Sequence, residues 1–192
     1  LFLLDDGFSH VALARDLAGK EANAQRKQEL LEIADVCEWV PENPARTFRE
    51  ALQAQWWGQL FNRVEQTSSA MGQGRMDQYL LPYYRQDLAE GRITKESAIE
   101  LFHCLWLAMS QVTEIKLNPV AAAGTEGFSQ FSDVCVGGQT PDGHDATNEL
   151  SYLILESMRG LQITSPDPCV RIHAGTPDAF LHHVVECIKD GK

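Results

Sequence analysis

The chain has 192 residues, of which 44% are hydrophobic, and it carries 16 Lys and Arg against 27 Asp and Glu, for a net charge of −11. This is an ordinary globular composition with enough apolar side chains for a substantial core, which excludes a disordered or fibrous chain. Because phosphate binding needs concentrated positive charge and no Lys/Arg cluster occurs, a nucleic-acid partner is also excluded.

Two further expectations concern the membrane and the completeness of the chain. The apolar opening at residues 1–4 is too short for a signal sequence, and no other run approaches the roughly 18 residues that a membrane span needs. We therefore expect a cytoplasmic protein without a membrane partner. The chain begins without Met, in LFLLDDGF, and stops at KDGK, which indicates an internal piece of a longer protein.

Cysteine usage points to reduced thiols. The five cysteines are odd in number, widely spaced and set among apolar neighbours, unlike a disulfide framework. They are Cys37, Cys104, Cys135, Cys169 and Cys187. No CxxC or HxxH pair occurs, and the adjacent His182 and His183 cannot point the same way from a helix. We expect no metal site and interpret each cysteine as a small core side chain.

The first predicted helix spans residues 19–39, where Ala, Glu, Lys and Gln dominate and apolar residues return at helical spacing. Two prolines in VPENPAR break it. Thr47 and Glu50 then match the T-x-x-E capping box, in which a hydroxyl and a carboxylate satisfy the exposed amides of a helix start. A second helix is therefore predicted over residues 48–64, with a broad apolar face.

A loop and two helices are predicted next. The stretch EQTSSAMGQGR at residues 65–75 is small, polar and glycine-bearing, which indicates a loop that lines a site. A helix is predicted around Pro82, and Gly91 is expected to lie just beyond its end. Thr94 caps the following helix, which is apolar on nearly all sides and is expected to be buried.

The last part of the chain alternates strands and helices. Residues 116–149 predict a long irregular connection with one β-like run at 134–136, and the apolar content favours a functional loop. Asp145 or Thr147 is expected to cap a helix that closes at Gly160. A strand at 169–173 and a helix with Pro177 as its first residue follow. Strands separated by helices predict an α/β fold with parallel pairing, and nothing marks an internal domain boundary.

Three segments carry a family resemblance: GRMDQYLLPYY at 74–84, VGGQTPDGHDATNELSYLILE at 136–156 and PDPCVRIHAGTPDAFL at 166–181. Their order and spacing resemble the pyruvate formate-lyase-like domain of glycyl radical enzymes, and with the helices between them they cover nearly the entire chain. The resemblance implies that residues 1–192 are an internal fragment of a single such domain. It further implies that the fragment is a helix-rich part of a ten-stranded α/β barrel.

The resemblance also implies an oxygen-sensitive enzyme, in which a backbone glycyl radical generates a thiyl radical that abstracts hydrogen from the substrate. No cofactor is bound. A partner activating enzyme that uses S-adenosylmethionine and an iron–sulfur cluster installs the radical, and the full-length protein is expected to form a homodimer or hetero-oligomer. The family's GCV-like cysteine word and RVxGY-like glycine word are absent from these 192 residues. We therefore expect this piece to be inactive alone, and interpret Cys169 as barrel wall.

Candidate substrate contacts follow from the same resemblance. Ser68 and Ser69 match a family segment that contributes substrate-contacting side chains, and their hydroxyls can donate and accept hydrogen bonds. The alternative is that these small residues let the turn pack tightly. Phe131 falls near a position where relatives place an aromatic ring over the substrate, and Phe128 is close enough to be that residue instead. A plain core phenylalanine is the alternative. Arg171 is the candidate cation for an anionic substrate.

Other charged residues near the glycines have structural interpretations. Arg75 and Asp77 are expected to form an ion pair that fixes a tight turn, since buried charges need partners. Polar residues after the GGQ word are expected to cap the next helix or hold the loop: Asp142, Asp145, Asn148 and Glu149. Arg171 and His173 alternate along the predicted strand and share a face, from which they meet an anion or pair with helix carboxylates.

Within the family, the visible residues favour fumarate addition to a hydrocarbon, as in aryl- and alkylsuccinate synthases such as benzylsuccinate synthase. The small, uncharged Ser-Ser-Ala-Met lining suits an aromatic or aliphatic substrate. Ser69 stands where dehydratase-like members commonly have a His, which weakens a diol dehydratase. The alternatives are arylacetate decarboxylation, diol or hydroxyproline dehydration, other C–C, C–N or C–S lyase reactions, and formate acetyltransferase chemistry. A non-catalytic α/β binding module is a hypothesis of a different class.

Overall fold

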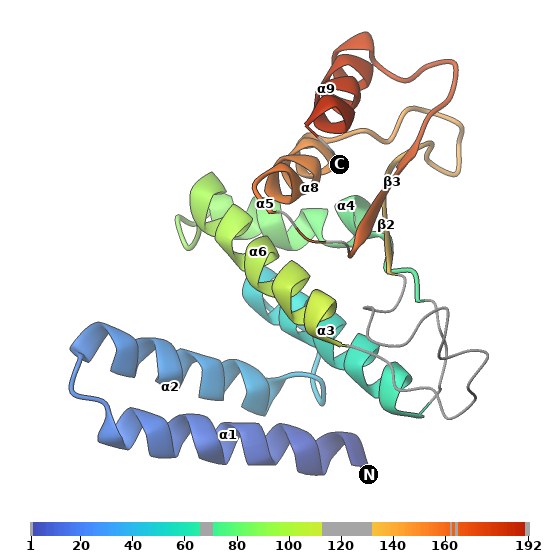
Figure 1. The fold of residues 1–192 in the computed structure, drawn as a ribbon. Helices are drawn as coiled ribbons and strands as arrows, with labels where there is room; N and C mark the ends of the chain where they lie inside the picture. Colours follow the sequence, from blue (N-terminus) through green and yellow to red (C-terminus); the bar gives the residue numbers. More distant parts are fainter. Residues whose placement is uncertain (1, 66–70, 113–131, 162, 164, 191–192) are drawn as a thin grey trace. The chain divides into compact units, whose positions relative to one another are not determined.

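The structure, a computed structural model, describes residues 2–65, 71–112, 132–161, 163 and 165–190 (Figure 1). The chain divides into two compact units, Leu1–Glu65 and Gln66–Lys192. The first unit is helical and the second holds the sheet. In the described ranges, no helix is both long enough and apolar enough to cross a membrane.

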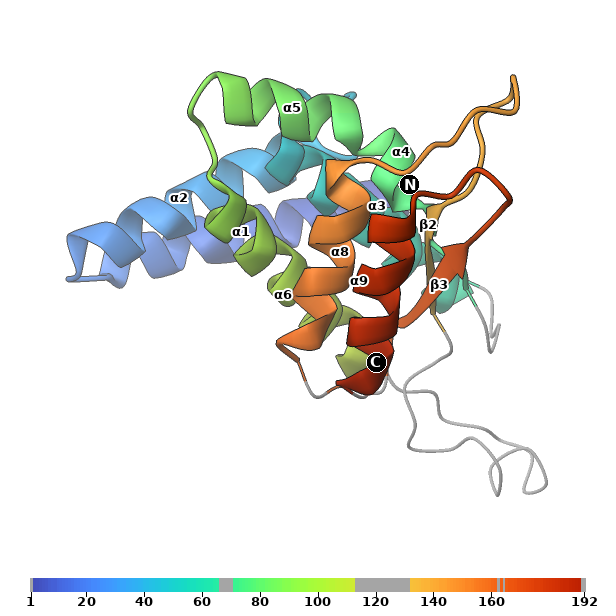
Figure 2. The same ribbon diagram turned by 90° about the horizontal axis from the view of Figure 1, so that it is seen from above.

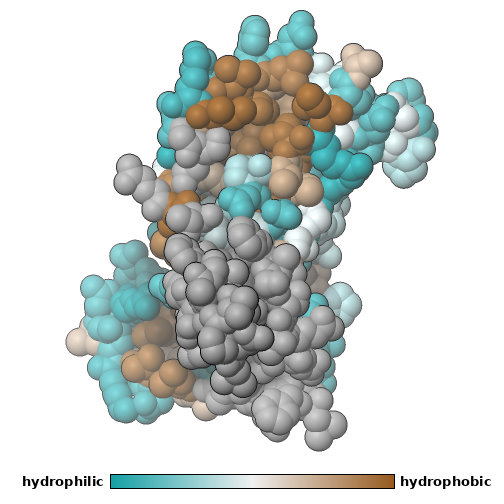
Figure 3. All heavy atoms as spheres, turned by 45° about the vertical axis from the view of Figure 1, so that its right-hand side comes forward, coloured by the Kyte–Doolittle hydropathy of each residue, from teal (hydrophilic) through white to brown (hydrophobic). Residues whose placement is uncertain are grey.

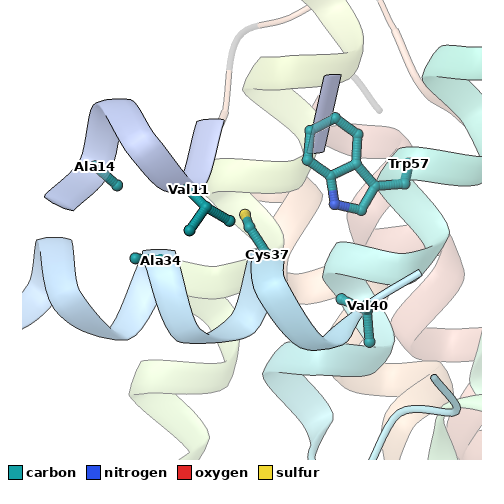
Figure 4. Close-up of a cluster of buried hydrophobic side chains, with 6 residues drawn as sticks. All are labelled: Val11, Ala14, Ala34, Cys37, Val40 and Trp57. Carbon is teal, nitrogen blue, oxygen red and sulfur yellow. The ribbon is translucent and has the colours of Figure 1, made fainter. Parts of the chain in front are cut away.

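The first unit consists of α1 (Phe2–Lys20), α2 (Ala24–Trp39) and α3 (Phe48–Glu65). α1 and α2 pack against each other as a hairpin, and α2 contacts α3. Six buried side chains form its core (Figure 4): Val11, Ala14, Ala34, Cys37, Val40 and Trp57. The start predicted for the first helix is wrong. α2 begins at Ala24 because the Asn23 side chain caps it, accepting a hydrogen bond from the Arg26 N–H at 3.0 Å.

The predicted start of α3 is confirmed, with one difference in its capping. Thr47 Oγ1 accepts a hydrogen bond from the Glu50 N–H at 3.2 Å, as expected. The Glu50 carboxylate, however, reaches the backbone N–H and the guanidinium of Arg46, both at 2.6 Å. Burial raises the pKa of Glu50, but these hydrogen bonds lower it by more, so the pKa of this carboxyl lies below its usual value.

The second unit is built around a parallel sheet in the order β1-β2-β3. The strands are β1 (Gly74–Arg75), β2 (Asp133–Gly137) and β3 (Asp167–Arg171). Cys135 lies opposite both Arg75 and Cys169 in the register. The predicted parallel pairing is confirmed, although β3 begins and ends two residues earlier than expected. Pro168 lies within β3, which is the outer strand of the described sheet and pairs with β2 alone there.

Within the described residues, the helices of this unit are α4 (Met76–Tyr79), α5 (Leu81–Ala89), α6 (Lys95–Gln111), α8 (Glu149–Arg159) and α9 (Asp178–Lys189). Thr94 starts α6 as predicted, through a reciprocal capping box with Ser97. Gly91 follows α5 with a φ of +68°, which confirms its expected place beyond the helix end. The fold is therefore α/β and rich in helix, as the sequence predicted.

Two helix starts differ from expectation. Asn148 caps α8, because its Oδ1 accepts the N–H groups two and three residues further on, at 2.9 and 3.3 Å. The capping role expected of Asn148 is thus confirmed, and that of Asp145 or Thr147 is wrong. Pro177 lies one residue before α9 instead of at its first position.

The two faces of the sheet differ in what covers them. Val134 and Val136 are completely buried, and α4 and α8 contact β2. Both ribbon views place α4, α8 and α9 on one side of β2 and β3 (Figures 1 and 2). The other face carries two pairs of register partners, Asp133 with Asp167 and Cys135 with Cys169. We call it the open face, because none of the described helices of this unit lies on it.

The outer side of α9 is apolar. Phe180 and Cys187 are buried, whereas a second set of apolar side chains recurs at helical spacing and is partly or largely exposed. This α9 stripe consists of Leu181, Val184, Val185 and Ile188. Val185 is 49% and Ile188 is 62% exposed. Figure 3 shows the apolar side chains gathered over α9.

Candidate functional site

The carboxyl ends of parallel strands meet at one edge of a sheet, the edge at which open α/β sheets bind ligands. Here that edge joins Arg75 of β1, the turn Gly137–Gly138–Gln139 after β2, and Arg171 of β3. Gly137 and Gly138 have φ angles of +72° and +87°, which side chains rarely allow. A Cβ on Gly137 would lie 3.0 Å from the Arg171 carbonyl oxygen. Glycine therefore lets this turn lie directly against the end of β3.

Asp77 fixes the turn from the helix side. It is fully buried, and its Oδ2 accepts hydrogen bonds from the Gly137 N–H at 2.7 Å and the Ser151 hydroxyl at 2.6 Å. Its backbone carbonyl accepts a third, from Asn148 Nδ2 at 3.0 Å. One residue thus connects the end of β1, the turn after β2 and the start of α8.

The predicted ion pair between Arg75 and Asp77 is wrong. Arg75 is the register partner of Cys135 and so belongs to the open face, where its Nη1 donates to the Gln139 carbonyl at 2.8 Å. The chain enters α4 at Met76, and this change from strand to helix sends Asp77 to the opposite side. Both side chains hold the same turn, but from different sides.

His173 reaches a carboxylate, although not one on a helix. Its Nε2 lies 3.0 Å from Asp145 Oδ1, and Thr147 donates to the same oxygen at 3.0 Å. Because His173 Nδ1 accepts the Gly175 N–H at 3.1 Å, the ring proton belongs on Nε2 and is donated to Asp145. β3 ends before His173, so the alternation that was expected to place it on one face with Arg171 does not extend that far.

Of the predicted substrate contacts, only Arg171 can be located. Its side chain is exposed and lies across Gly138, where an added Cβ would be 3.1 Å from Arg171 Cβ and 3.5 Å from its Nε. Ser68, Ser69, Phe128 and Phe131 lie outside the described residues. In the sequence the two serines precede β1 and the two phenylalanines precede β2, whereas Arg171 ends β3. Whether they meet around one substrate stays a prediction.

The open face carries a pair of thiols and a pair of carboxylates that sequence reasoning missed. Cys135 and Cys169 are register partners. Burial raises the pKa of Cys169, and Asp133 and the thiol of Cys135, which is within hydrogen-bonding reach, raise it further. The pKa of Asp167 is raised by burial and by Asp133. Cys169 therefore stays a protonated thiol at neutral pH.

A sequence signal for this arrangement exists, because β2 and β3 begin with the same pattern, Asp-x-Cys-Val, at 133–136 and 167–170. When two parallel strands that pair in register carry the same sequence pattern, identical residues lie opposite each other. All five cysteines are free. The described part of the chain holds no group of three or more His, Cys, Asp or Glu side chains that could bind a metal ion.

Comparison with known proteins gives a consistent result. A family model described as "Pyruvate formate lyase-like" matches residues 8–192. The isethionate sulfite-lyase of Nitratidesulfovibrio vulgaris is 51% identical over 95% of this chain and 22% of its own length. The (2S)-3-sulfopropanediol dehydratase of Klebsiella oxytoca is 36% identical over the same shares of both chains.

A solved structure from Roseburia inulinivorans, concerned with 1,2-propanediol dehydration, superposes with a TM-score of 0.93 at 36% identity. The superposition covers 98% of this chain and 22% of that one. A glycyl radical enzyme from Archaeoglobus fulgidus gives a TM-score of 0.91 at 35% identity, over 98% of this chain and 24% of its own. The chain therefore spans a little over a fifth of the length of the relatives it matches.

Proposed function

Because the chain belongs to the pyruvate formate lyase-like family, within the glycyl radical enzymes, we propose that the full-length protein is a carbon–sulfur lyase acting on a small hydroxysulfonate such as isethionate. The observation that carries the proposal is the 51% identity to an isethionate sulfite-lyase over 95% of the chain. The dehydratases are more distant, with 36% identity for the sulfopropanediol enzyme and 31% for a trans-4-hydroxy-L-proline dehydratase of Clostridioides difficile.

These relatives replace the expectation of fumarate addition. They are lyases and dehydratases, not succinate synthases, so the alternatives kept in the sequence analysis are better supported than the reaction it favoured. The absence of a His at Ser69, which weakens a diol dehydratase, agrees with a lyase that removes sulfite in place of water.

The proposed reaction balances as an elimination. In isethionate, HO–CH₂–CH₂–SO₃⁻, the C–S bond breaks and one hydrogen moves from the hydroxyl-bearing carbon to the carbon that lost sulfur. The hydroxyl proton leaves with the sulfur group, so the products are acetaldehyde, CH₃CHO, and hydrogensulfite, HSO₃⁻. The radical chemistry would need the catalytic cysteine and the radical-bearing glycine of the family, whose sequence motifs do not occur in these 192 residues. It would also need a partner activating enzyme that installs the radical. The part of the enzyme described here would supply barrel wall and a water-excluding surface, which radical chemistry requires.

The test uses the full-length enzyme, activated without oxygen by its activating enzyme. It is incubated separately with isethionate, with 2,3-dihydroxypropane-1-sulfonate and with 1,2-propanediol, and sulfite and aldehydes are measured against unactivated enzyme. We expect activation-dependent release of equal amounts of sulfite and acetaldehyde from isethionate. If propanal from 1,2-propanediol were the only product, the protein would be a dehydratase and the lyase proposal would be wrong.

A second candidate is dehydration of a small sulfonated diol. The specific support is that the 36% identical relative from Klebsiella oxytoca is named for a sulfonated substrate as well, and that the chain superposes closely on a structure concerned with diol dehydration. In the same assay this function predicts an aldehyde from 2,3-dihydroxypropane-1-sulfonate without release of sulfite.

A further inference from the structure

Arginines in this chain are paired with carboxylates almost everywhere that the structure describes them. The sequence contains ten arginines, and seven form ion pairs: Arg15, Arg26, Arg46, Arg49, Arg85, Arg92 and Arg159. An eighth, Arg63, is engaged in other contacts. Within the described residues, Arg75 and Arg171 form no ion pair with a carboxylate. In a chain with a net charge of −11, a missing carboxylate partner calls for an explanation.

These two arginines converge on one turn. Arg75 Nη1 donates to the carbonyl of Gln139, and the Arg171 side chain lies across Gly138, the residue before it. Both belong to the carboxyl edge of the sheet, Arg75 from β1 and Arg171 from β3, with β2 between them. The positive φ of Gly138 and its lack of a side chain are what allow Arg171 to lie so close to the backbone.

Carboxylates are present at this edge, but their hydrogen bonds go elsewhere. Asp77 accepts from the Gly137 N–H and from Ser151 on the helix side. Asp145 accepts from Thr147 and His173. Neither forms an ion pair with Arg75 or Arg171 in the described structure. These two carboxylates therefore do not serve as direct partners of the two guanidinium groups.

Of the two arginines, Arg75 gives the stronger indication that an anion binds at this edge. Its Nε and Nη2 are shielded from solvent and have no hydrogen-bond partner, while its Nη1 is satisfied by Gln139. Buried donors without a partner are rare, and a guanidinium that has lost its hydration carries a cost unless an anion compensates it. Nε and Nη2, which have no partner here, are the two donors through which a guanidinium can bind an oxyanion with a pair of parallel hydrogen bonds.

We propose that Arg75 and Arg171 form a binding site for a small sulfur oxyanion at the carboxyl edge of the sheet. The shared chemistry is a negatively charged SO₃ group, either the sulfonate of a bound substrate or the sulfite released from it. The choice of sulfur over other oxyanions rests on the proposed function. The site itself rests on the two unpaired guanidinium groups and the turn that brings them together.

The test is direct binding to the unactivated full-length protein, without oxygen, by isothermal titration with sodium sulfite and, separately, with sodium isethionate. The variants are Arg171→Gln, which changes an exposed side chain, and Arg75→Lys, which keeps the charge but loses the planar pair of donors. Arg85→Gln is the matched control, because Arg85 is an exposed arginine of the same unit that already pairs with Glu149. We expect Kd to rise on the order of tenfold or more in the first two variants and to stay unchanged in the control.

The outcomes separate the ligand sources and the two proposals. A rise in Kd for isethionate assigns the site to the substrate, and a rise for sulfite alone assigns it to the product. Unchanged Kd values for both ligands in Arg171→Gln and Arg75→Lys would overturn the site, as would equal weakening in Arg85→Gln. Arginine-dependent sulfite binding in an enzyme that releases no sulfite from isethionate would support the site and refute only the proposed lyase activity.

Discussion

Replacing Asp77 with Ala is expected to loosen the edge of the sheet on which the candidate site is built. The change removes the acceptor of two buried hydrogen bonds, from the Gly137 N–H at 2.7 Å and the Ser151 hydroxyl at 2.6 Å. Hydrogen bonds to a charged group contribute about 1.5–3 kcal/mol each, so local opening should become easier by roughly 3 kcal/mol or more. That free energy corresponds to about a hundredfold faster exchange of the protected amides.

Hydrogen exchange followed by mass spectrometry on the full-length protein measures this opening directly, in peptides covering residues 133–151. Asp77→Asn should give a smaller effect, because both bonds end on the same oxygen and the neutral amide oxygen can still accept them, although without the charge. Asp87→Ala is the matched control: Asp87 is also buried, at 2% exposure, but pairs with Arg92. Unchanged protection of 133–151 in Asp77→Ala, or equal loss in Asp87→Ala, would refute the reasoning.

Three further predictions concern single residues. Gly137→Ala should destabilise the protein by more than Gly143→Ala, because both glycines have a positive φ but only Gly137 has backbone and ring atoms within 3.2 Å of an added Cβ; urea unfolding of the two variants compares them. Glu50 has a lowered pKa, so it stabilises the start of α3 above its unfolded pKa and loses that contribution as pH falls through the folded value. Glu50→Gln should therefore flatten the acid dependence of amide protection in residues 46–52 between pH 7 and pH 3, and an unaltered profile would contradict this. Ser157→Ala should cost about 1–3 kcal/mol in thermal or urea unfolding, because the buried Trp106 Nε1–H loses its acceptor at 2.9 Å, and adding Trp106→Phe should recover part of that loss.

Most helix ends with local signals could be predicted from the sequence, whereas features decided by distant contacts could not. Thr47, Gly91 and Thr94 mark helix ends by their own side chains or conformations, and the structure confirms each of them. The break before α2 was missed because the sequence on both sides favours helix, and a single capping residue, Asn23, decides it. A local cap is thus readable where the flanking sequence also interrupts the helix, and it is missed where, as at Asn23, that sequence favours helix on both sides.

The candidate site shows the opposite case. Arg75 and Asp77 are two residues apart, which suggested an ion pair, yet the change from strand to helix between them separates their side chains. The pairing of Cys135 with Cys169 depends on the register of two strands 34 residues apart in the sequence, and the shared Asp-x-Cys-Val pattern indicates it only once those strands are known to be neighbours. Arg171 was predicted to be the cation that binds an anionic substrate, and this role stays a prediction until binding is measured.

The α9 stripe bears on the fate of incomplete copies of this protein in a cell. A helix that exposes Val185 and Ile188 to water offers the kind of apolar surface that chaperones and proteases recognise. In any copy of the protein that leaves this stripe uncovered, α9 would therefore itself mark the molecule for removal.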